Sequence, residues 1–304
     1  MTSFSNVAVI IPCLNEEQAI GHVVRSISLS LPGAMVYVYD NGSSDETMSV
    51  AAEAGAIVRA EPTRGKGNVV RRMFADVDAD VYVMLDGDGT YDPSAAPSLV
   101  KKLQLEKLDL VTGVRVSNVS THSSYRRGHR FGNAIFTRLL KIAFRSDCAD
   151  VLSGYRVMSR RFVKSFPSAA RGFEIEVEMT AHASLLRVPA GEVETFYGNR
   201  TEGTASKLRT YRDGLRIGRA LFRIFRAYAP SRFFGTLAGL SGCFTGVFAV
   251  LALADDSIGL SAYTIASGVS FVIAALLFSV GVILNALARQ RIEVLRLAYL
   301  GLRT

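Results

Sequence analysis

Tryptophan is absent from this chain of 304 residues, and cysteine and histidine are scarce. The three cysteines, Cys13, Cys148 and Cys243, are odd in number and far apart, which is not the pattern of a disulfide framework. No two of them have the C-x-x-C spacing of a zinc site, and the four histidines show no ligand spacing. The composition therefore indicates neither a disulfide-stapled domain nor a zinc fold.

The N-terminus lacks the features of a secretory signal. MTSFSNVAVIIPC has no positively charged region at its start, and its apolar run is too short for a signal peptide. We therefore expect the N-terminal part of the chain to stay in a reducing cytoplasm.

Basic residues are missing from a long C-terminal stretch. No Lys, Arg or His occurs between Phe233 and Ala288, although the whole chain has a formal net charge of +8. ADDSIG (254–259) divides this stretch into two apolar segments, each longer than the ~20 residues that cross a bilayer core. They predict transmembrane helices at about 233–254 and 261–288. The alternative, a buried helix pair in a soluble core, is disfavoured by charge-free runs of this length.

Both flanks of this hairpin are basic. RIGRALFRIFRAYAPSR (216–232) precedes it and RQRIEVLRLAYLGLR (289–303) follows it, whereas the connector has two Asp and no basic residue. The positive-inside rule then places both flanks in the cytoplasm. Apolar residues among the arginines of 215–228 predict an amphipathic helix at the membrane surface. Small residues are expected to let the two spans pack closely, namely Gly235, Gly239, Gly242 and Gly246.

Strands and helices alternate ahead of the hairpin. Apolar runs predict strands at 7–13, 34–39, 56–59, 81–85 and 108–112. Helical spacing is present at 16–29, 44–55, 66–75 and 93–105. Asn15 is placed to cap the first helix, and Gly55 to stop the second. Continuous apolar strands separated by helices predict a mostly parallel, Rossmann-like α/β sheet covered on both faces.

Polar residues follow three of these strands. They are Asn15-Glu16-Glu17, Asp40-Asn41-Gly42 and Asp86-Gly87-Asp88. In open α/β sheets, ligands bind beyond the carboxyl ends of the strands, so we expect one shared pocket at this edge. The pocket is acidic in a basic protein, and two aspartates suit Mg²⁺ or Mn²⁺.

The segment DGDGT (86–90) has other interpretations. As a calcium loop counted from Asp86 it lacks the required glycine at position 6 and the glutamate at position 12. Asp-Gly pairs also form simple turns without a ligand. Phosphatases related to haloacid dehalogenases share the local pattern, but they normally carry it on their first strand. The adjacent acidic pair such a site needs would be Asp255-Asp256, which falls in the predicted connector.

Five motifs, in this order, resemble the family-2 glycosyltransferases with a GT-A fold. They are VAVIIPCLNEE (7–17), YDNGSSDET (39–47), RGKGN (64–68), DGDGTYDP (86–93) and LSGYRVMSRRF (152–162). Within this family the chain looks most like the dolichyl- or undecaprenyl-phosphate sugar synthases, over residues 7 to about 215, and some of those enzymes carry two C-terminal helices. Two departures are Asn41, where the family commonly has Asp, and Gly89-Thr90, where it often has Leu and Gln.

The resemblance implies an inverting, metal-dependent hexosyltransferase (EC 2.4.1-like) that moves a sugar from a UDP- or GDP-hexose to a polyprenyl phosphate and releases a nucleoside diphosphate. Asp86 and Asp88 are expected to hold the Mg²⁺ or Mn²⁺ that neutralises the leaving diphosphate. Asp88 is then the direct ligand, and Asp86 faces the ribose or the metal through water. The residues expected to line the nucleotide pocket are Pro12, Asn15, Glu17, Asp40, Arg64 and Lys66.

The expected acceptor side is basic. YRRGHRFGN (125–133) concentrates arginines, which bind phosphate oxygens in bidentate fashion. A solvated charge run is the alternative here, and attraction to anionic lipid, ~1 kcal/mol per basic residue, is the alternative for 200–218. The expected lipid-phosphate ligands are Arg115, Arg126, Arg127, Arg130, Asn133, Arg200, Ser206, Lys207 and Arg209.

Acidic residues alternate in GFEIEVEMTAHA (172–183). A strand here would carry Glu174, Glu176 and Glu178 on one face, whereas a helix would spread them. A phosphate acceptor is already ionised at neutral pH and needs no strong base. We therefore place Glu176 and Glu178 among the catalytic residues as groups that bind the metal or orient the acceptor.

The sequence thus predicts a cytoplasmic GT-A domain at 1–210, an amphipathic helix at 211–232, and two spans with a basic tail at 233–304. We expect an integral protein of the cytoplasmic membrane with both termini in the cytoplasm. Its partners are a nucleotide-sugar, polyprenyl phosphate and the bilayer; no nucleic-acid motif is present, and a homo-oligomer stays open. The alternatives are transfer to another lipid or glycan, or a non-catalytic nucleotide-sugar binder. Processive synthases usually need a Gln-x-x-Arg-Trp element, which a chain without Trp lacks.

Overall fold

The computed structural model of the protein describes residues 6–116, 148–167, 170–172, 174–198, 218–219, 222, 225–226, 229–254 and 261–302. The chain divides into two compact units. One comprises Met1–Ala220 together with Leu295–Thr304, and the other comprises Leu221–Val294. The first unit contains a seven-stranded sheet, and the second consists of long apolar helices.

The sheet has the strand order β3-β2-β1-β4-β6-β5-β7. Among its strands, β6 alone runs against its neighbours β4 and β5, while all other pairs are parallel. The mostly parallel sheet is therefore confirmed. The strands are β1 (Val7–Cys13), β2 (Met35–Asp40), β3 (Ile57–Ala60), β4 (Val81–Met84), β5 (Leu110–Val116), β6 (Arg156–Ser159) and β7 (Ala190–Phe196).

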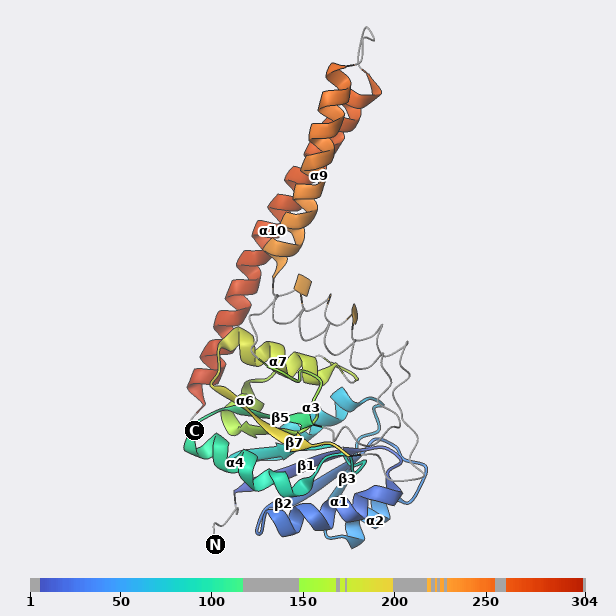
Figure 1. Ribbon diagram of the computed structural model, residues 1–304, viewed down its shortest axis with the longest axis vertical. Helices are drawn as coiled ribbons and strands as arrows, with labels where there is room; N and C mark the ends of the chain where they lie inside the picture. The colour runs from blue at the N-terminus through green and yellow to red at the C-terminus, as the bar shows by residue number, and fades with distance from the viewer. Residues whose placement is uncertain are drawn as a thin grey trace. The chain divides into compact units, whose positions relative to one another are not determined.

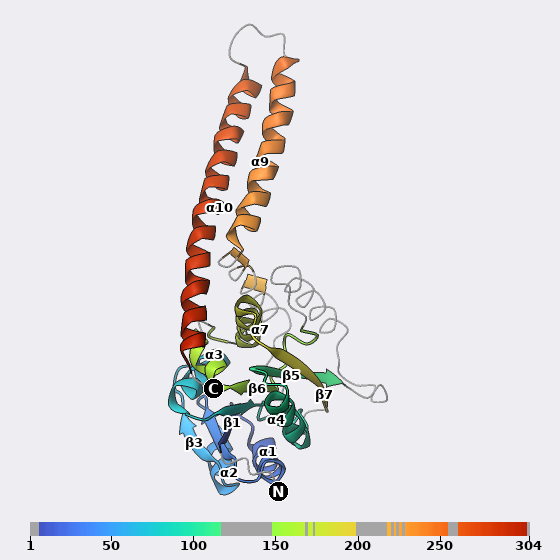
Figure 2. The ribbon, with the colours of Figure 1, turned by 90° about the vertical axis from the view of Figure 1, so that its left-hand side faces the viewer.

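Helices cover both faces of this sheet (Figures 1 and 2). One face carries α1 (Glu17–Ser30), α2 (Thr47–Glu53) and α4 (Ala96–Leu105), with the short helix η1 (Pro93–Ala95) leading into α4. The other face carries α3 (Lys66–Asp76), α6 (Arg160–Ser165) and α7 (Ile175–Leu186). This two-sided cover explains why β1 and β4 are apolar and buried at every position.

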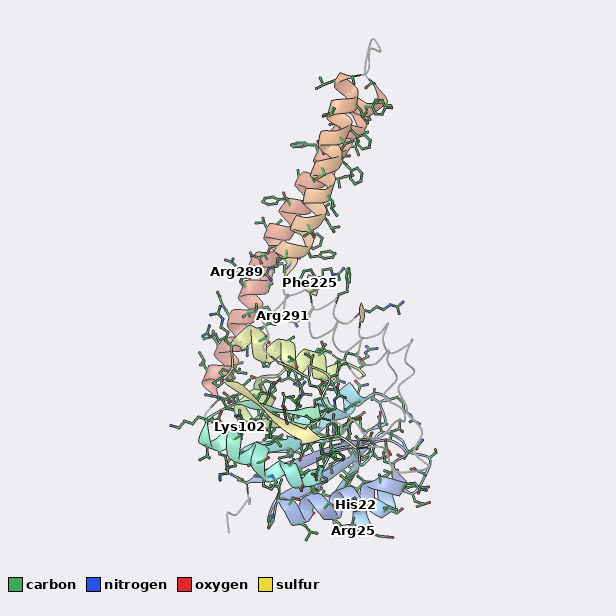
Figure 3. All side chains as sticks on the ribbon, in the orientation of Figure 1. His22, Arg25, Lys102, Phe225, Arg289 and Arg291 are labelled. Atoms are coloured by element: carbon green, nitrogen blue, oxygen red, sulfur yellow. The ribbon has the colours of Figure 1, made fainter. Side chains whose placement is uncertain are left out.

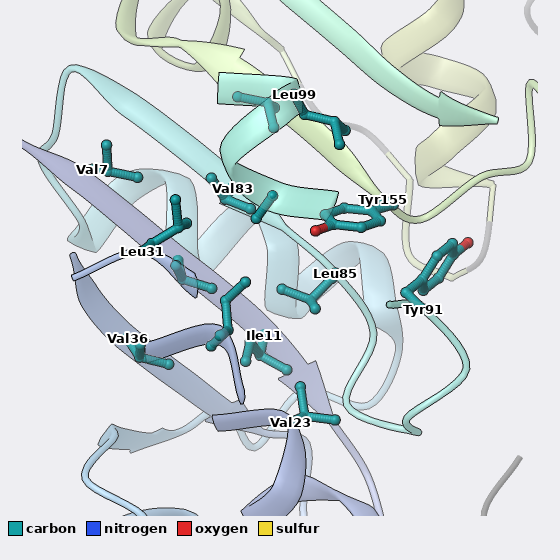
Figure 4. Packing of buried hydrophobic residues seen from close by; sticks show 14 of the residues in the cluster. Val7, Ile11, Val23, Leu31, Val36, Val83, Leu85, Tyr91, Leu99 and Tyr155 are labelled. Carbon is teal, nitrogen blue, oxygen red and sulfur yellow. The ribbon is translucent and has the colours of Figure 1, made fainter. Parts of the chain in front are cut away.

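Apolar side chains of β1, β4 and α1 build the core between these layers (Figure 4). Val9, Ile11 and Val83 are fully buried, as are Ile20 and Ile27 of α1 at helical spacing. Burying each such side chain contributes roughly 1.5–3 kcal/mol. The core therefore fixes β1 beside β4 and brings their carboxyl ends to the same edge.

The start of the first two helices differs from the prediction. Asn15 does not cap α1, because Glu16 is the N-cap and makes no side-chain capping bond. Asn15 has φ 50° and its side chain instead accepts the Ser44 N–H at 2.8 Å. α2 begins at Thr47 rather than Ser44, because residues 43–46 bond to the first loop. Long-range bonds between two loops thus replace local capping.

A buried polar cluster surrounds Asp109, the residue just before the first residue of β5. Asp109 is 1% exposed and accepts bidentate bonds from Arg161 at 2.7 and 2.6 Å, and a further bond from Ser159 at 2.5 Å. The hydroxyl of Tyr299, near the chain end, also donates to Asp109. Burial favours the neutral acid, but these hydrogen bonds outweigh it and hold the pKa of Asp109 below its usual value. The last turn of the final helix therefore belongs to the first unit.

A buried histidine makes the first unit sensitive to acid. His182 of α7 is 4% exposed and lies edge-to-face against Phe162 and Phe166. Burial disfavours the charged imidazolium and lowers the pKa of His182 to about 4, whereas it is about 6.5 in an unfolded chain. Between these pH values the unfolded chain binds more protons, so the free energy of unfolding falls as the pH drops, by up to about 1.4 kcal/mol per pH unit.

We expect His182→Gln to lose this component, because glutamine does not titrate. Denaturant unfolding of the wild type and the variant at pH 7 and pH 5 measures it. His22→Gln serves as the matched control, since His22 is exposed on α1 (Figure 3). An equal pH dependence in the two variants would contradict the assignment.

The second unit contains α9 (Pro230–Leu253) and most of α10 (Ala262–Gly301), which lie side by side (Figure 2). Both helices are long and apolar enough to cross a membrane. α10 has 40 residues, about 60 Å at 1.5 Å per residue, and it continues through Arg289 and Arg291 beyond the apolar part (Figure 3). The connector 255–260 and most of residues 211–228, in the predicted amphipathic segment, lie outside the described residues.

The expected packing of the two long helices through glycines is wrong. A Cβ added at Gly235, Gly239, Gly242 or Gly246 meets nothing within 4 Å. The helices contact through other groups: Ser241 donates to the Ser270 carbonyl at 2.9 Å and Ser267 to the Thr245 carbonyl at 3.2 Å. A Cβ on Gly281 would lie 2.9 Å from Phe234 Cβ. Serine bonds and the Gly281 contact therefore set which face of α9 meets α10.

Candidate active site

Three polar strand ends meet at one edge of the sheet. β1 pairs in parallel with β2, where Cys13 lies opposite Asp40, and with β4, which ends at Met84. The Asn41 N–H donates to the Cys13 carbonyl at 2.9 Å just past the strands. The loops that begin at Leu14, Asn41 and Leu85 therefore share one edge.

The first two loops are joined through expected nucleotide-binding residues. The Asn15 N–H donates to Ser43 Oγ at 2.8 Å, and Glu17 Oε2 accepts the Glu46 N–H at 3.0 Å. Asp40 is 2% exposed, and its Oδ2 accepts the N–H groups of Gly42 and Ser43 at 2.8 Å each. Pro12 is buried in β1 opposite Tyr39. These residues join the first two loops at this edge, and their role in binding a nucleotide stays a prediction.

Asn41 organises the loop that leads to Lys66, a role that the sequence analysis missed. Its Nδ2 donates to the carbonyls of Glu61 and Thr63 at 2.9 Å each, and its Oδ1 accepts the Gly65 N–H at 2.6 Å. An aspartate, which the family commonly has here, has no hydrogen to donate. Asn41 therefore makes two bonds here that an aspartate could not make. The exposed Arg64 guanidinium lies 3.4 Å from where a Gly42 Cβ would be.

We expect Asn41→Asp to loosen this loop, because a carboxylate would face two carbonyl oxygens. Losing the two bonds should lower the free energy of unfolding by about 1–3 kcal/mol and weaken nucleotide binding. Denaturant unfolding and UDP titration measure both effects. Gln104→Glu, the same amide-to-acid change at an exposed position of α4, is the control. Wild-type behaviour of both variants would refute the role of Asn41.

The DGDGT loop follows β4, and its two aspartates differ in surroundings. Asp86 Oδ1 lies 2.5 Å from Lys66 Nζ, and its side chain is 30% exposed. Asp88 is 4% exposed, and its Oδ1 accepts the N–H and the hydroxyl of Thr90 at 3.1 and 2.6 Å. Asp86 is thus paired with an ammonium, and Asp88 accepts two hydrogen bonds from Thr90 within its own loop.

Lys66 also contacts Glu176 Oε1 at 2.6 Å. Burial disfavours the ammonium, but the charges of Asp86 and Glu176 outweigh it and raise the pKa of Lys66. Burial likewise raises the pKa of Glu176, against the lowering effect of Lys66. The sequence placed Lys66 at the nucleotide; the structure places its ammonium between two carboxylates at the same edge.

Residues 175–186 form the helix α7 and not a strand, so the three glutamates diverge. Glu176 faces Lys66, Glu178 Oε2 accepts the Ala170 N–H at 2.9 Å, and Glu174 Oε1 accepts the Arg171 N–H at 3.2 Å. Of the two glutamates predicted to be catalytic, Glu176 contacts Lys66, which also contacts Asp86. Glu178 holds the segment that precedes α7.

Arg115 lies in a tight ion pair. Its Nε and Nη2 donate to the two oxygens of Asp150 at 2.6 and 2.7 Å, and its guanidinium lies 5.4 Å from the centre of the Tyr197 ring. Its expected role in binding lipid phosphate stays a prediction. The other expected ligands of the lipid phosphate lie outside the described residues: Arg126, Arg127, Arg130, Asn133, Arg200, Ser206, Lys207 and Arg209.

Backbone hydrogen bonds join the DGDGT loop to the residues just after β7, and these residues also bond to the end of β5. Tyr91 forms an antiparallel bridge with Tyr197, and the Gly198 N–H donates to the Thr90 carbonyl at 2.8 Å. The Tyr197 N–H donates to the Val116 carbonyl at 3.1 Å. The chain therefore enters segments 117–147 and 199–217 from positions beside the aspartates. Tyr91 belongs to the DGDGTYDP motif, but the sequence analysis assigned no role to Tyr91 or Tyr197.

A divalent ion at this edge would share its shell between carboxylates and other oxygen ligands. Among the residues that the structure describes, no group of three or more His, Cys, Asp or Glu could cage a metal. Mg²⁺ and similar ions commonly take one or two carboxylates and complete their shell with phosphate oxygens and water. Asp88 suits this, with Asp86 beside it, so the donor set matches a metal that arrives with a diphosphate.

The sequence matches the profile of the family described as "Glycosyl transferase family 2" over residues 8–166, just over half of the chain. This chain belongs to that family. It is 32% identical to Glycosyltransferase AglJ of Haloferax volcanii, over 82% of each chain. It is 53% identical to Protein RfbJ of Shigella flexneri, over 41% of this chain and 96% of the relative. A dolichyl-phosphate hexose transferase of H. volcanii is 27% identical, over 73% of this chain and 95% of the relative.

The solved structures support the same fold for this glycosyltransferase. Glucosyl-3-phosphoglycerate synthase from Mycobacterium tuberculosis, in complex with Mn²⁺, UDP and glucosyl-3-phosphoglycerate, has a TM-score of 0.59 and 26% identity. The match covers 73% of this chain and 80% of the synthase. The GT-A fold and the expectation of a nucleotide-sugar transferase are therefore confirmed.

Proposed function

We propose that this glycosyltransferase transfers a hexose from a UDP- or GDP-hexose to a polyprenyl phosphate, with inversion at the anomeric carbon. The observation that carries the proposal is the set of backbone hydrogen bonds that place the DGDGT loop beside the ends of β5 and β7. The two basic segments expected to bind the lipid phosphate, 125–133 and 200–218, follow those ends in the sequence. Donor and acceptor would thus meet at Asp86 and Asp88.

The residues at this edge suit a single displacement. An oxygen of the lipid phosphate attacks the anomeric carbon while the bond to the diphosphate oxygen breaks, and the nucleoside diphosphate leaves with the electron pair. The attacking oxygen is already ionised, so no side chain has to remove a proton. Mg²⁺ or Mn²⁺, held by Asp88 with Asp86 nearby, would neutralise charge on the leaving diphosphate. The Mn²⁺ and UDP in the related synthase structure support this assignment.

The apolar helices support a lipid acceptor and a membrane location. α9 and α10 meet the length and composition of membrane spans, and one relative is named as a dolichyl-phosphate hexose transferase. The bond from Tyr299 to Asp109 joins the chain end to the first unit. The C-terminus and the catalytic residues then lie on the same side of the bilayer, which agrees with the basic flanks.

This topology predicts that a C-terminal tag is on the cytoplasmic side. Protease should remove the tag from inside-out membrane vesicles and spare it in right-side-out vesicles. A tag inserted in the connector 255–260 is the matched control and should show the reverse pattern. Cleavage of the C-terminal tag in right-side-out vesicles would overturn the hairpin.

The transfer itself is tested with a panel of radiolabelled UDP- and GDP-hexoses, each incubated with the full chain, Mg²⁺ or Mn²⁺, and polyprenyl phosphate. We expect label from one donor to enter the lipid fraction and EDTA to stop it. A parallel arm with 3-phosphoglycerate tests a second candidate, transfer to a soluble phosphorylated acceptor, which the likeness to the mycobacterial synthase favours. Label in the soluble product and none in lipid would reject the polyprenyl acceptor.

A further inference from the structure

Gly87, the middle residue of the Asp-Gly-Asp segment, packs against the end of β1. A Cβ added at Gly87 would lie 2.4 Å from Cys13 Sγ. The same Cβ would lie 3.3 Å from Ile20 Cδ1 and 3.4 Å from Ile11 Cγ2. Real Cβ atoms essentially never come within 3.0 Å of another such atom. The thiol of Cys13 therefore occupies the space that a side chain at position 87 would need.

The backbone at position 87 does not itself require glycine. Among the described residues, the glycines with a positive φ are Gly33, Gly42, Gly55, Gly65 and Gly89, and Gly87 is not one of them. Glycine is favoured over other residues mainly where φ is positive. The surrounding side chains, and Cys13 above all, therefore account for a glycine between the two aspartates.

Cys13 has little room to move away from Gly87. It is 3% exposed, and its neighbours Ile11 and Ile20 are fully buried in the core between β1 and α1 (Figure 4). A close-packed interior leaves few voids into which the thiol could turn. The loop on the other side of the contact is more open, since the Asp86 side chain is 30% exposed. Enlarging either partner of the contact therefore displaces the loop rather than the thiol.

Cys13 also contacts the neighbouring loop. It is the last residue of β1, where it lies opposite Asp40 of β2, and its carbonyl accepts the Asn41 N–H at 2.9 Å. One residue thus contacts the loop that begins at Asn41 through its backbone and the DGDGT loop through its thiol. In the proposed function the nucleotide and the metal bind at these two loops, so the size of this side chain sets the spacing between them.

We propose that Cys13 is a positioning residue for the transfer reaction, and that its thiol and Gly87 form a size-matched pair that fixes the DGDGT loop relative to the end of β1. The thiol takes no part in the chemistry and acts through the backbone of Gly87. The inference rests on the proposed metal-assisted transfer and adds the residue that holds the metal-binding loop in place from behind.

The test is Mn²⁺ binding to the purified full chain with UDP, followed by electron paramagnetic resonance of free Mn²⁺, which does not depend on turnover. Gly87→Ala displaces the loop, so we expect Mn²⁺ to bind at least about 10-fold weaker, because binding groups must be held within about 0.5 Å of their productive positions. Cys13→Val adds a methyl group from the opposite side and should weaken binding in the same direction. Cys13→Ala should stay within about threefold of the wild type, because a smaller side chain does not displace the loop.

Cys13→Ala combined with Gly87→Ala tests the size match directly. The space that the thiol gives up takes the new methyl group, so Mn²⁺ affinity should return to within about threefold of the wild type. Gly191→Ala is the matched control. Its added Cβ would lie 2.7 Å from Leu108 Cδ1, but Gly191 lies at the start of β7, whereas the DGDGT loop contacts the residues after the end of that strand. Denaturant unfolding of each variant separates a loss of stability from a loss of Mn²⁺ affinity.

Wild-type Mn²⁺ affinity in Gly87→Ala and in Cys13→Val would overturn the inference. So would a double variant that binds Mn²⁺ as weakly as Gly87→Ala, or a Gly191→Ala variant that does so. If Gly87→Ala does not fold, Cys13→Val and the double variant decide. The proposed lipid acceptor fails by a different readout, since label would then not enter the lipid. The two failures are therefore distinguishable.

Discussion

Asp88→Asn is expected to lower the rate of sugar transfer by about 100-fold or more, because a neutral amide is a poor ligand for the ion that neutralises the leaving diphosphate. The fold should survive, since the asparagine oxygen can still accept the Thr90 bonds that Asp88 accepts at 3.1 and 2.6 Å. Transfer of label from the nucleotide-sugar into lipid, measured at saturating donor, checks the rate. Denaturant unfolding checks the fold.

The matched control is Asp92→Asn, the same change four residues away. Asp92 Oδ1 accepts the Ser94 N–H at 2.9 Å as the cap of a short helix, and asparagine caps equally well. This variant should keep near wild-type activity. If Asp88→Asn were as active as Asp92→Asn, the chain could not use Asp88 for metal-assisted transfer, and a non-catalytic nucleotide-sugar binder would become the better reading.

Arg126→Ala combined with Arg127→Ala is expected to raise KM for polyprenyl phosphate by about 10- to 100-fold. Each charge-assisted hydrogen bond to phosphate contributes about 1.5–3 kcal/mol, and part of it would be replaced by water. The donor side should respond little, because Asn15, Asp40 and Asn41 shape that edge. Initial rates at varied lipid concentration, together with UDP titration, separate the two effects.

A charge-matched control is Arg25→Ala with Lys101→Ala, which removes two exposed basic residues from α1 and α4. It keeps the same net charge as the arginine variant and should leave KM for the lipid unchanged. An equal rise of KM in both variants would show general attraction to anionic lipid. An equal loss of lipid and nucleotide binding in the arginine variant would refute the acceptor assignment.

Local patterns predicted β1 to β5 but neither β6 nor β7, for a physical reason. Strands covered on both faces must be apolar at every position, and this signal is strong in 7–13 and 81–85. The predicted beginnings of the first two helices differ from the structure. Asn15 has the composition of a cap, but its side chain bonds to Ser44 in another loop. A side chain can accept a hydrogen bond from a local or from a distant donor. Only the fold shows which donor lies within reach.

The alternating acids of 172–183 show the limit of short patterns. Period-two alternation over a few residues suits a strand, yet residues 175–186 form α7. The helix packs on the sheet face that also carries α3, and there Glu176 meets Lys66. The glycines of α9 show the same limit, since helical spacing marks a stripe of small residues without telling which face meets α10.

The sequence by itself determined the family, the alternation of strands and helices, the acidic strand ends and two spans without basic residues, because each is written in residues close together along the chain. The tertiary structure decided that Lys66 lies between Asp86 and Glu176, that Arg115 is paired with Asp150, and that Tyr299 returns to Asp109. These contacts join residues tens to more than a hundred positions apart. They depend on the path of the backbone and on the need to pair buried charges, and no local period encodes either.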